Sequence, residues 1–488
     1  MKPEDLLVKE RIDKLEKLKK LGVNPYPSKF EKKDDIIDLV TKYSKLKNEE
    51  STKDKVNTAG KIMSIREMGK LSFLDIQDEK AKIQCFIRED ELKNKYEVYK
   101  LLDIGDIIGV EGIVFRTKRG ELSILVKDLD ILTKSLKPLP DKWHGLKDVE
   151  EIFRKRYLDL LMNHEVKQLF YKKAKFWQTI RNFLLSKGFL EVETPVLENS
   201  AGGAAATPFK THHNSLDIDV YLRISMGELW QKKLLVGGFE KTFEIGRQFR
   251  NEGVDTEHLQ DYSQMEFYWA YANYKDGMEL VQEMYKLVAK EVLGTLKFKT
   301  HGFEIDLGKK WELYDYESLI KEKTEINIFE ATKKDIQKKL DSLKMEYEKN
   351  ADKWRLVDVL WKYCRKSLSG PGFLVNQPVD VTPLAKRNEK DPRKVEQFQV
   401  ILAGTELGNG YSELNDPLDQ EERFLEQRKL KESGDKEAHE HDESFVEALK
   451  YGMPPACGFG VSERLFSFLV DKSIRECVLF PIMKPEKN

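Results

Sequence analysis

The sequence has few cysteines and no arrangement that would pair them. Four of its 488 residues are cysteine (Cys85, Cys364, Cys457 and Cys477), and no two form a Cys-x-x-Cys pair. This spacing argues against a disulfide framework and against a structural zinc site. No apolar run approaches the ~18 residues of a membrane-spanning helix, and the N-terminus is charged where a signal peptide is apolar. We therefore expect no membrane association and a cytoplasmic location.

An excess of charge of either sign is also missing. The 84 lysines and arginines are balanced by 85 acidic residues, so the formal net charge is -1. A nucleic-acid partner therefore cannot be inferred from overall charge, and any RNA contact requires local basic faces. The Lys-rich stretch 9–33 is one candidate, although its mixture of Glu and Lys is more typical of a solvated helix. Charged residues at 35% indicate heavily solvated surfaces.

The length of the chain predicts two or three domains. Residues 3–21 show the spacing of an amphipathic helix, whereas 55–132 consist of short alternating segments separated by Gly and charged turns, which indicates a small β-barrel. Pro-containing residues 136–141 are typical of a linker. Beyond them helices and strands alternate irregularly, as in an α+β domain, and 311–368 is helical in pattern without a motif. The predicted parts are 1–52, a helical extension; 53–135, the barrel; 136–150, the linker; and 151–488, the larger domain.

The strongest local signal is a charged hairpin in the larger domain. Phe243, Ile245 and Phe249, then Met265 and Phe267, alternate as in two strands joined by a polar loop. Arg250 and Glu252 share parity and should project from one face. A guanidinium beside carboxylates suits a triphosphate or an acyl phosphate, which Arg can contact twice. A surface hairpin with ion pairs is the alternative interpretation.

Two further segments flank this hairpin. Upstream, Gly188-Phe-Leu-Glu-Val-Glu-Thr-Pro195 follows an amphipathic stretch; downstream, Gly458-Phe-Gly-Val-Ser-Glu-Arg464 precedes an apolar run. In this order the three segments resemble motifs 1, 2 and 3 of the class II aminoacyl-tRNA synthetases. The segments 201–206, 211–214, 221–224, 237–240 and 408–416 narrow the resemblance to the bacterial-type class II lysyl-tRNA synthetases, over about residues 11–485.

The resemblance implies an α+β fold: an N-terminal OB-fold barrel that binds the anticodon, and a catalytic domain built on an antiparallel β-sheet flanked by helices. It also implies a homodimer. The expected reaction is that of a lysine–tRNA ligase. The carboxylate of L-lysine attacks the α-phosphorus of ATP to give lysyl-adenylate and pyrophosphate, and a ribose hydroxyl at the 3′ end of tRNA(Lys) then takes the lysyl group. Because no protein nucleophile is required, catalysis should consist of placement and charge neutralisation.

The resemblance assigns two sets of site residues. Arg250, Glu252 and Arg464 are the expected catalytic residues; Arg250 should bind the α-phosphate and the substrate carboxylate. The expected ATP-binding residues are Arg250, Glu252, His258, Tyr262, Glu406 and Arg464, with Tyr262 stacked on adenine. The expected lysine-binding residues are Gly203, Glu228, Arg250, Glu266, Tyr268, Asn409, Tyr411 and Glu413. Within this set Glu413 and Tyr268 meet the side-chain ammonium, and Glu228 and Gly203 the α-amino group.

The metal site is where the chain departs from the family. ATP chemistry implies Mg²⁺, bound by hard oxygen ligands together with the phosphates. Glu406 matches one family carboxylate, but Gln399 stands where a second Glu is expected. Motif 3 has Ser462 in place of a third glycine and is one residue short, whereas Met226-Gly-Glu-Leu229 is one residue longer than its counterpart.

For the anticodon, the resemblance places Phe73 against the central base, with Arg66, Gln84 and Glu121 near the base edges. Flat rings can stack unpaired bases, but Phe73 in the barrel core is an alternative, since apolar strand residues are usually buried. Two alternative functions also stay open. An aspartyl or asparaginyl synthetase shares the motifs, although an acidic pocket disfavours it, and a catalytically impaired RNA-binding paralogue is suggested by Gln399 and the short motif 3.

Overall fold

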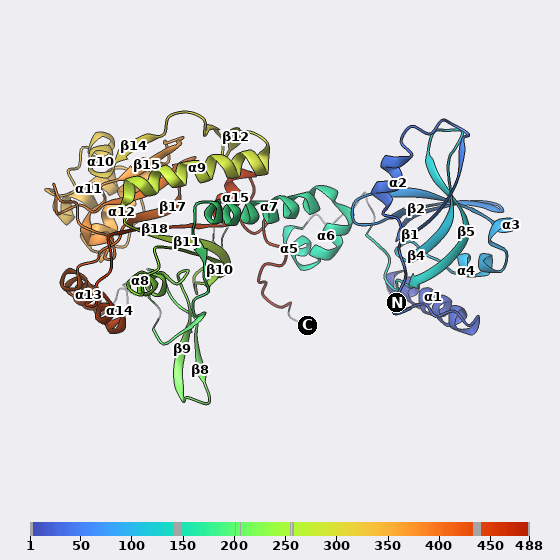
Figure 1. Ribbon diagram of the computed structural model, residues 1–488, viewed down its shortest axis with the longest axis horizontal. Coiled ribbons are helices and arrows are strands. Elements are labelled where there is room, and N and C mark those ends of the chain that lie inside the picture. The colour runs from blue at the N-terminus through green and yellow to red at the C-terminus, as the bar shows by residue number, and fades with distance from the viewer. Residues whose placement is uncertain are drawn as a thin grey trace. The chain divides into compact units, whose positions relative to one another are not determined.

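The structure is a computed structural model that describes residues 3–140, 148–200, 202–204, 206–253, 255, 258–432 and 441–486. The chain forms two compact units, which we call the barrel unit (1–152) and the sheet unit (153–488) (Figure 1). Of the predicted linker, residues 141–147 lie outside the described residues. In the described part of the chain no helix is long and apolar enough to cross a membrane.

The barrel unit contains a closed five-stranded barrel in the order β1-β2-β3-β5-β4, as the sequence predicted. Alternation sends Leu74 and Ile76 inward, where both are fully buried. Lys134 is also buried there and is paired with Asp103 and Asp106 at 2.5 and 2.8 Å. The strands are β1 (Ser51–Met68), β2 (Leu71–Gln77), β3 (Lys82–Arg88), β4 (Ile107–Arg116) and β5 (Leu122–Thr133), and the helices are α1 (Pro3–Lys20), α2 (Ile36–Lys42), α3 (Glu89–Leu92), η1 (Lys93–Lys95) and α4 (Tyr96–Tyr99).

The sheet unit is built on an eight-stranded sheet in the order β14-β15-β16-β17-β18-β11-β10-β6. All neighbouring strands are antiparallel except the pairs β14·β15 and β10·β6. The predicted α+β fold is therefore confirmed. The sheet strands are β6 (Leu190–Glu191), β10 (Lys241–Phe249), β11 (Asp261–Ala270), β14 (Glu312–Asp315), β15 (Gly372–Val375), β16 (Gln397–Leu402), β17 (Thr405–Ser412) and β18 (Ala456–Ser462).

Smaller strands and a set of helices complete this unit. The additional strands are β7 (Leu197–Glu198), β8 (Lys210–His213), β9 (Ile218–Leu222), β12 (Lys297–Thr300) and β13 (Phe303–Asp306). The helices are α5 (Val149–Arg154), which crosses the boundary between the units, α6 (Arg156–Met162), α7 (His164–Ser186), α8 (Glu228–Val236), α9 (Tyr274–Leu293), α10 (Tyr316–Thr324), α11 (Lys333–Ser342), α12 (Lys353–Arg365), η2 (Val379–Val381), α13 (Pro417–Glu432), α14 (Glu443–Leu449) and α15 (Arg464–Leu469).

One face of the sheet carries the main core. Helix α9 begins with the capping box of Asn273 and Asp276 and lies along the sheet beside α7 (Figure 1). Its Gly277 permits the close approach, because a Cβ there would lie 2.5 Å from Cys457 Sγ. Beneath it, the rings of Phe398 and Phe459 stack at 5.6 Å. The opposite face of the same strands is therefore the one available for a site.

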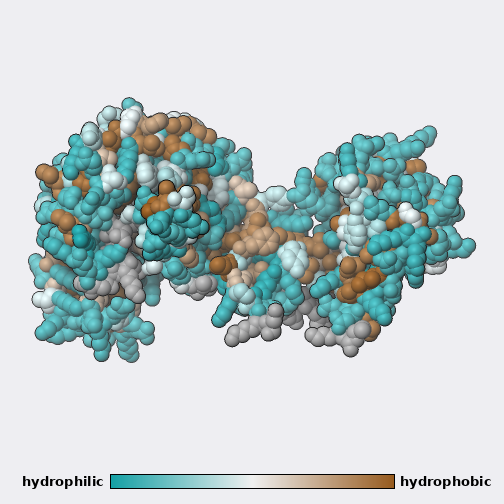
Figure 2. Space-filling view, turned by 90° about the horizontal axis from the view of Figure 1, so that it is seen from below, coloured by the Kyte–Doolittle hydropathy of each residue, from teal (hydrophilic) through white to brown (hydrophobic). Residues whose placement is uncertain are grey.

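The helical prediction for 311–368 needs a correction. Helices α10, α11 and α12 do form and bury a cluster around Trp361, but the segment begins with strand β14, which is parallel to β15 at the edge of the sheet. Its four residues are too few to show a period, and its partner strand lies far along the chain. Figure 2 shows a predominantly hydrophilic surface with scattered apolar areas, as the charged composition predicted.

Candidate active site

Four neighbouring strands bring the predicted site residues together through their register. Tyr268 of β11 pairs with Gly458 of β18, which pairs with Tyr411 of β17, which pairs with Gln397 of β16. Two residues along, a second row runs through Glu266, Gly460, Asn409 and Gln399. Because side chains alternate along a strand, both rows face away from α9. They line a cavity of about 1120 Å³, and the surface-hairpin interpretation of β10 and β11 is wrong.

The two glycines in these rows make the floor of the cavity flat. A Cβ on Gly458 would lie 2.1 Å from Glu413 Oε1 and 2.7 Å from the Tyr268 ring. A Cβ on Gly460 would lie 3.1 Å from the Glu266 side chain. The glycines of the predicted motif 3 therefore leave space for the acidic side chains of the adjoining strands. Ser462, at the place of the third glycine, accepts a 3.3 Å hydrogen bond from the Arg464 amide.

Three buried carboxylates gather at one end of the cavity. Glu228 begins α8, Glu266 lies on β11, and Glu413 directly follows β17; each is at most 6% exposed. Burial and the charge of Glu228 raise the pKa of Glu266 to about 7. For Glu413, burial outweighs the attraction of Lys232 and raises the pKa to about 8. A carboxyl in such surroundings binds a proton near neutral pH unless a cation compensates its charge.

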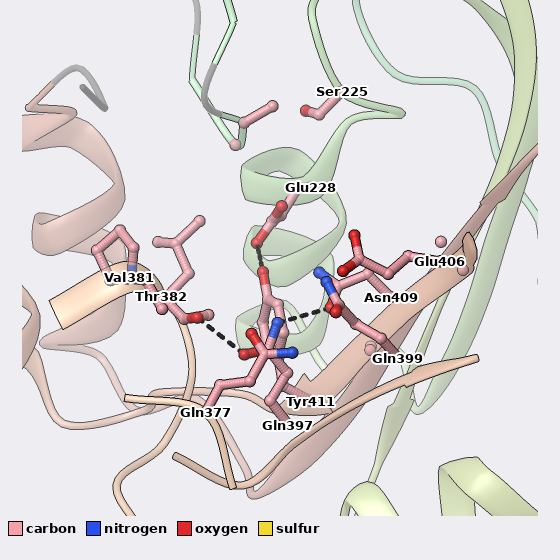
Figure 3. A pocket seen from close by; sticks show the side chains of 18 of the residues that line it. Ser225, Glu228, Gln377, Val381, Thr382, Gln397, Gln399, Glu406, Asn409 and Tyr411 are labelled. Carbon is pink, nitrogen blue, oxygen red and sulfur yellow. Dashed lines mark hydrogen bonds between the residues drawn. The ribbon is translucent and has the colours of Figure 1, made fainter. Parts of the chain in front are cut away.

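The ammonium of Lys232 compensates part of this charge. Its Nζ lies 2.7 Å from Glu228 Oε1 and 2.6 Å from Glu413 Oε2. Tyr411 donates a hydrogen bond to Glu228 (Figure 3), and Tyr268 donates one of 3.0 Å to Glu266 Oε2. Neither oxygen of Glu413 accepts a hydrogen bond among the described residues, although Oε2 is ion-paired with Lys232. The cluster therefore contains three carboxylates and one ammonium, which contacts two of them. Glu413 Oε1 remains available to a ligand.

Cationic groups lie at another part of the cavity. Arg250 follows β10; its Nε donates 3.3 Å to the Ile224 carbonyl, and its guanidinium lies 5.8 Å from the centre of the Tyr262 ring. His258 and Glu252 are exposed on the loop between β10 and β11, and His258 Nδ1 lies 2.7 Å from Asp255 Oδ2. Of the residues predicted to bind ATP, Arg250, Glu252, His258, Tyr262 and Arg464 line this cavity, as does Gly203; their roles stay predictions.

The region predicted to bind metal contains fewer charges than the family pattern. Glu406, Gln399 and Asn409 lie close together (Figure 3), and all three line the cavity. Trp361 donates its indole N–H to Glu406 Oε1, and Arg365 Nε is 3.9 Å from the same oxygen. The described residues contain no group of three or more His, Cys, Asp or Glu side chains that could bind a metal ion. Oxygen donors are present, but of the two predicted metal ligands, Glu406 and Gln399, only Glu406 can carry a charge.

A second candidate surface lies on the outside of the barrel. Phe73 and Phe86 are paired across β2 and β3 and stack at 4.8 Å, and Phe115 packs 5.8 Å from Phe86. Phe73 is half-buried and lies outside the barrel core, so the core alternative is wrong. The other three predicted residues share this face: Arg66 pairs with Phe73, Gln84 accepts a hydrogen bond from Ser123, and the exposed Glu121 precedes Ser123 by two residues.

Sequence reasoning missed Lys232, Trp361 and Arg365. The one available signal for Lys232 was its position four residues after Glu228, which on a helix predicts an ion pair. That pattern is the same on exposed helices, so burial could not be deduced from it. Trp361 and Arg365 lie on α12, whose segment carried no recognised motif.

Comparisons with known proteins agree with this geometry. The family model described as tRNA synthetases class II (D, K and N) matches residues 148–484, and the model for an OB-fold nucleic acid binding domain matches 56–132. The lysine–tRNA ligase of Thermotoga maritima is 45% identical over 98% of this chain and 96% of its own length. The lysine–tRNA ligases of Carboxydothermus hydrogenoformans and Moorella thermoacetica are each 44% identical, over 98% and 100% of both chains.

The raised carboxyl pKa values predict how stability depends on pH. Folded Glu413, with a pKa of about 8, retains a proton that the unfolded chain releases near the ordinary glutamate value of 4.5. The free energy of unfolding should therefore fall as pH rises between these values, by about 1 kcal/mol per pH unit for one such group. Glu413→Gln should make this slope shallower in urea unfolding followed by tryptophan fluorescence. Glu426→Gln, at an exposed carboxylate of the same cavity, should keep it; equal slopes in the wild type and Glu413→Gln would contradict the assignment.

Proposed function

The chain belongs to the class II tRNA synthetases, among their lysine–tRNA ligases, and we infer from this that it activates L-lysine with ATP and transfers the lysyl group to the 3′ end of tRNA(Lys). The single observation that carries the substrate assignment is the charge of the pocket. When all are ionised, Glu228, Glu266 and Glu413 carry three negative charges against the one positive charge of Lys232, and without a ligand the raised pKa values of Glu266 and Glu413 favour protons on these groups near neutral pH. The two ammonium groups of lysine would make this end of the cavity neutral, which burial strongly favours.

We propose that lysine binds along the two rows of paired residues that line the cavity. Its side-chain ammonium would meet the open Glu413 Oε1 and the Tyr268 hydroxyl, and its methylene groups would pack on Tyr411. Glu228 and the Gly203 backbone would bind the α-amino group, and Glu266 on β11 would add negative charge to the pocket. Asn409 and Arg250 would bind the α-carboxylate. A neutral or acidic side chain would leave Glu413 without a counter-charge, which disfavours aspartate and asparagine.

We propose that ATP occupies the cationic part of the same cavity. Arg250 would neutralise both the lysine carboxylate and the α-phosphate, which repel one another as they approach. Tyr262 would stack on the adenine ring, while Glu252, His258 and Arg464 would contact the nucleotide. The fixed positions of these groups place the carboxylate oxygen near the phosphorus, so that orientation supplies much of the rate.

Mg²⁺ is proposed to bind together with the ATP phosphates. The oxygen atoms of Glu406 and Gln399 are donors of the type that Mg²⁺ prefers, but only Glu406 contributes charge. A bound ion would neutralise negative charge on the phosphates. The indole of Trp361 donates a hydrogen bond to Glu406 Oε1 and thereby orients this carboxylate.

The barrel, 53–135, is proposed to bind the anticodon of tRNA(Lys), and 151–488 to catalyse both steps, with 1–52 as a helical extension and 136–150 as a linker. Unpaired bases would stack on Phe73, with Arg66, Gln84 and Glu121 beside the base edges. We further propose a homodimer, because the side chains of Leu185, Leu190 and Leu197, in and beside the predicted motif 1, are 48–51% exposed. The cytoplasmic location stays a prediction.

Amino-acid-dependent exchange of pyrophosphate into ATP tests the proposed function. Exchange should require lysine, since that step involves no tRNA. Exchange with aspartate or asparagine alone would instead assign the neighbouring specificity. A folded protein that shows no exchange with any of the three would support the impaired RNA-binding paralogue suggested by Gln399 and Ser462.

Glu413→Gln should raise the KM for lysine in this exchange by about 100-fold, because it removes a buried counter-charge that interacts directly with the substrate ammonium. The KM for ATP should change little, since the nucleotide lies elsewhere in the cavity. Glu426→Gln, a carboxylate of the same cavity that is exposed, serves as the control. An unchanged lysine KM would remove Glu413 from the pocket.

Phe73→Ala should weaken aminoacylation of tRNA(Lys) by raising the KM for tRNA about tenfold, the effect of losing stacking on about one base. Lysine-dependent pyrophosphate exchange in the same variant is the internal control and should be unaffected. A parallel loss of both activities would contradict the assignment of anticodon binding to this face of the barrel.

A further inference from the structure

Lys232 is a fully buried ammonium inside the proposed amino-acid pocket. It lies on α8 one turn after Glu228, and its side chain is 1% exposed. Its Nζ contacts Glu228 Oε1 and Glu413 Oε2 at 2.7 and 2.6 Å, thereby joining the two carboxylates proposed for opposite ends of the substrate. A surface ion pair contributes little to stability, but one buried in a ligand cavity determines the charge that a ligand meets.

Aromatic rings fix the position of this ammonium. The Lys232 Nζ lies 6.0 Å from the ring centre of Tyr268, 5.5 Å from that of Tyr411 and 5.7 Å from that of Phe445. Ring faces attract cations at such distances. These rings come from β11, β17 and α14, so the ammonium is enclosed from several sides and stays in place when a ligand enters.

The contacts of Lys232 divide the oxygens of Glu413 between the protein and the cavity. Oε2 lies 2.6 Å from Lys232 Nζ in an ion pair, whereas Oε1 lies above Gly458; neither oxygen accepts a hydrogen bond in the described part of the chain. Glu228 Oε1 likewise contacts both Lys232 and Tyr411. Each carboxylate is therefore oriented by the built-in cation.

We propose that Lys232 is a positioning residue that sets amino-acid specificity: its ammonium holds Glu228 and Glu413 in place and favours their ionised forms, so that each can bind one ammonium group of a diamino acid when the substrate displaces the remaining protons. This inference rests on the proposed function, since it concerns how the same pocket selects lysine. When all three carboxylates are ionised, they and Lys232 together have a net charge of −2, which two substrate ammoniums balance. Without Lys232 that net charge would be −3, and the pocket would hold a proton more tightly.

The location of that proton determines the consequence. The titratable groups that face Lys232 and its partners are Glu228, Glu266, Tyr268, Tyr411, Glu413 and the Cys457 thiol. Glu413 has a pKa of about 8 even beside Lys232, which lowers it, so Glu413 is the group that holds its proton still more tightly when the cation is removed. A protonated Glu413 binds a hydroxyl or amide about as well as an ammonium. Loss of Lys232 should therefore weaken lysine binding at pH values below the raised pKa of Glu413. It should also reduce the preference for an ammonium over a hydroxyl or amide.

The test compares Lys232→Met with Lys233→Met. Lys233 is the next residue on α8, is only partly buried, and contacts Ser444 instead of the carboxylates. Calorimetry would give the lysine Kd between about pH 6.5 and pH 9. A rise of one unit in the pKa of the Glu413 carboxyl predicts that Lys232→Met binds lysine about tenfold more weakly than the wild type at pH 7. The ratio of the two Kd values should approach one as the pH rises. Titration of the free lysine amino groups affects both proteins equally and cancels in this ratio.

Discrimination provides the second readout. In pyrophosphate exchange, the preference for lysine over 6-hydroxynorleucine should fall about tenfold in Lys232→Met, while the ATP KM and the preference of Lys233→Met stay unchanged. Lys232→Gln, which retains donor capacity without charge, should behave like Lys232→Met. Both variants should fold, because a proton can replace the missing cation.

Three results would overturn the proposal. One is a folded Lys232 variant with wild-type lysine affinity and preference; another is a deficit that does not change with pH. The third is loss of folded protein in both variants even near pH 6, which would make Lys232 a purely structural residue. Failure of the wild type to show lysine-dependent exchange would instead reject the proposed function, so the two failures are distinguishable.

Discussion

Excess negative charge in a closed space is the constraint on which the sheet unit depends. Glu228, Glu266 and Glu413 are buried within one cavity, and only Lys232 contacts two of them from the protein side among the described residues. Unpaired charge in a protein interior is strongly unfavourable, so the ligand-free pocket must bind protons, and the raised carboxyl pKa values reflect this. In the proposed binding mode a dicationic amino acid would replace those protons with ion pairs. The same imbalance that lowers the stability of the ligand-free protein would then provide affinity and selectivity for lysine.

The register of the central strands makes this imbalance possible. Gly458 and Gly460 on β18 lie between the acidic and tyrosine side chains of β11 and β17, and any larger residue would fill the space those side chains occupy. The opposite face of the same strands packs Phe267, Phe398 and Phe459 beneath α9. Hydrophobic burial on that face stabilises the strands, so the other face can carry unbalanced charge without local unfolding. The glycines in the strands thus belong to the shape of the cavity.

The sequence was sufficient for the hairpin of β10 and β11, because charged residues set in an alternating apolar pattern are typical of a strand that faces a ligand. The resemblance of segment 408–416 supplied the prediction of Glu413, and that of motif 3 the prediction of Arg464. It was not sufficient for Lys232, since a Glu–Lys pair four residues apart is equally common on solvated helices. The face of β2 that carries Phe73 was ambiguous, because the apolar residues Leu74 and Ile76 lie next to it in the alternating pattern. The polar residues Asp75 and Gln77 share a face with Phe73 and indicated that this face is the outer one. Strand β14 was missed because its pairing with β15 depends on a distant segment.

The proposed binding mode sets opposite electrostatic requirements for the two substrates. For lysine the protein would be anionic and the substrate would supply the positive charge. For ATP, Arg250 and Arg464 would supply the positive charge, and of the two predicted metal ligands only Glu406 is acidic; it accepts a hydrogen bond from Trp361 and lies near Arg365. A neutral Gln399 would repel phosphate less than a glutamate would. Less of the phosphate charge would then have to be neutralised by a bound cation, and more would be met by arginine side chains. The proposed binding mode therefore predicts that the balance between metal and protein cations shifts toward the protein.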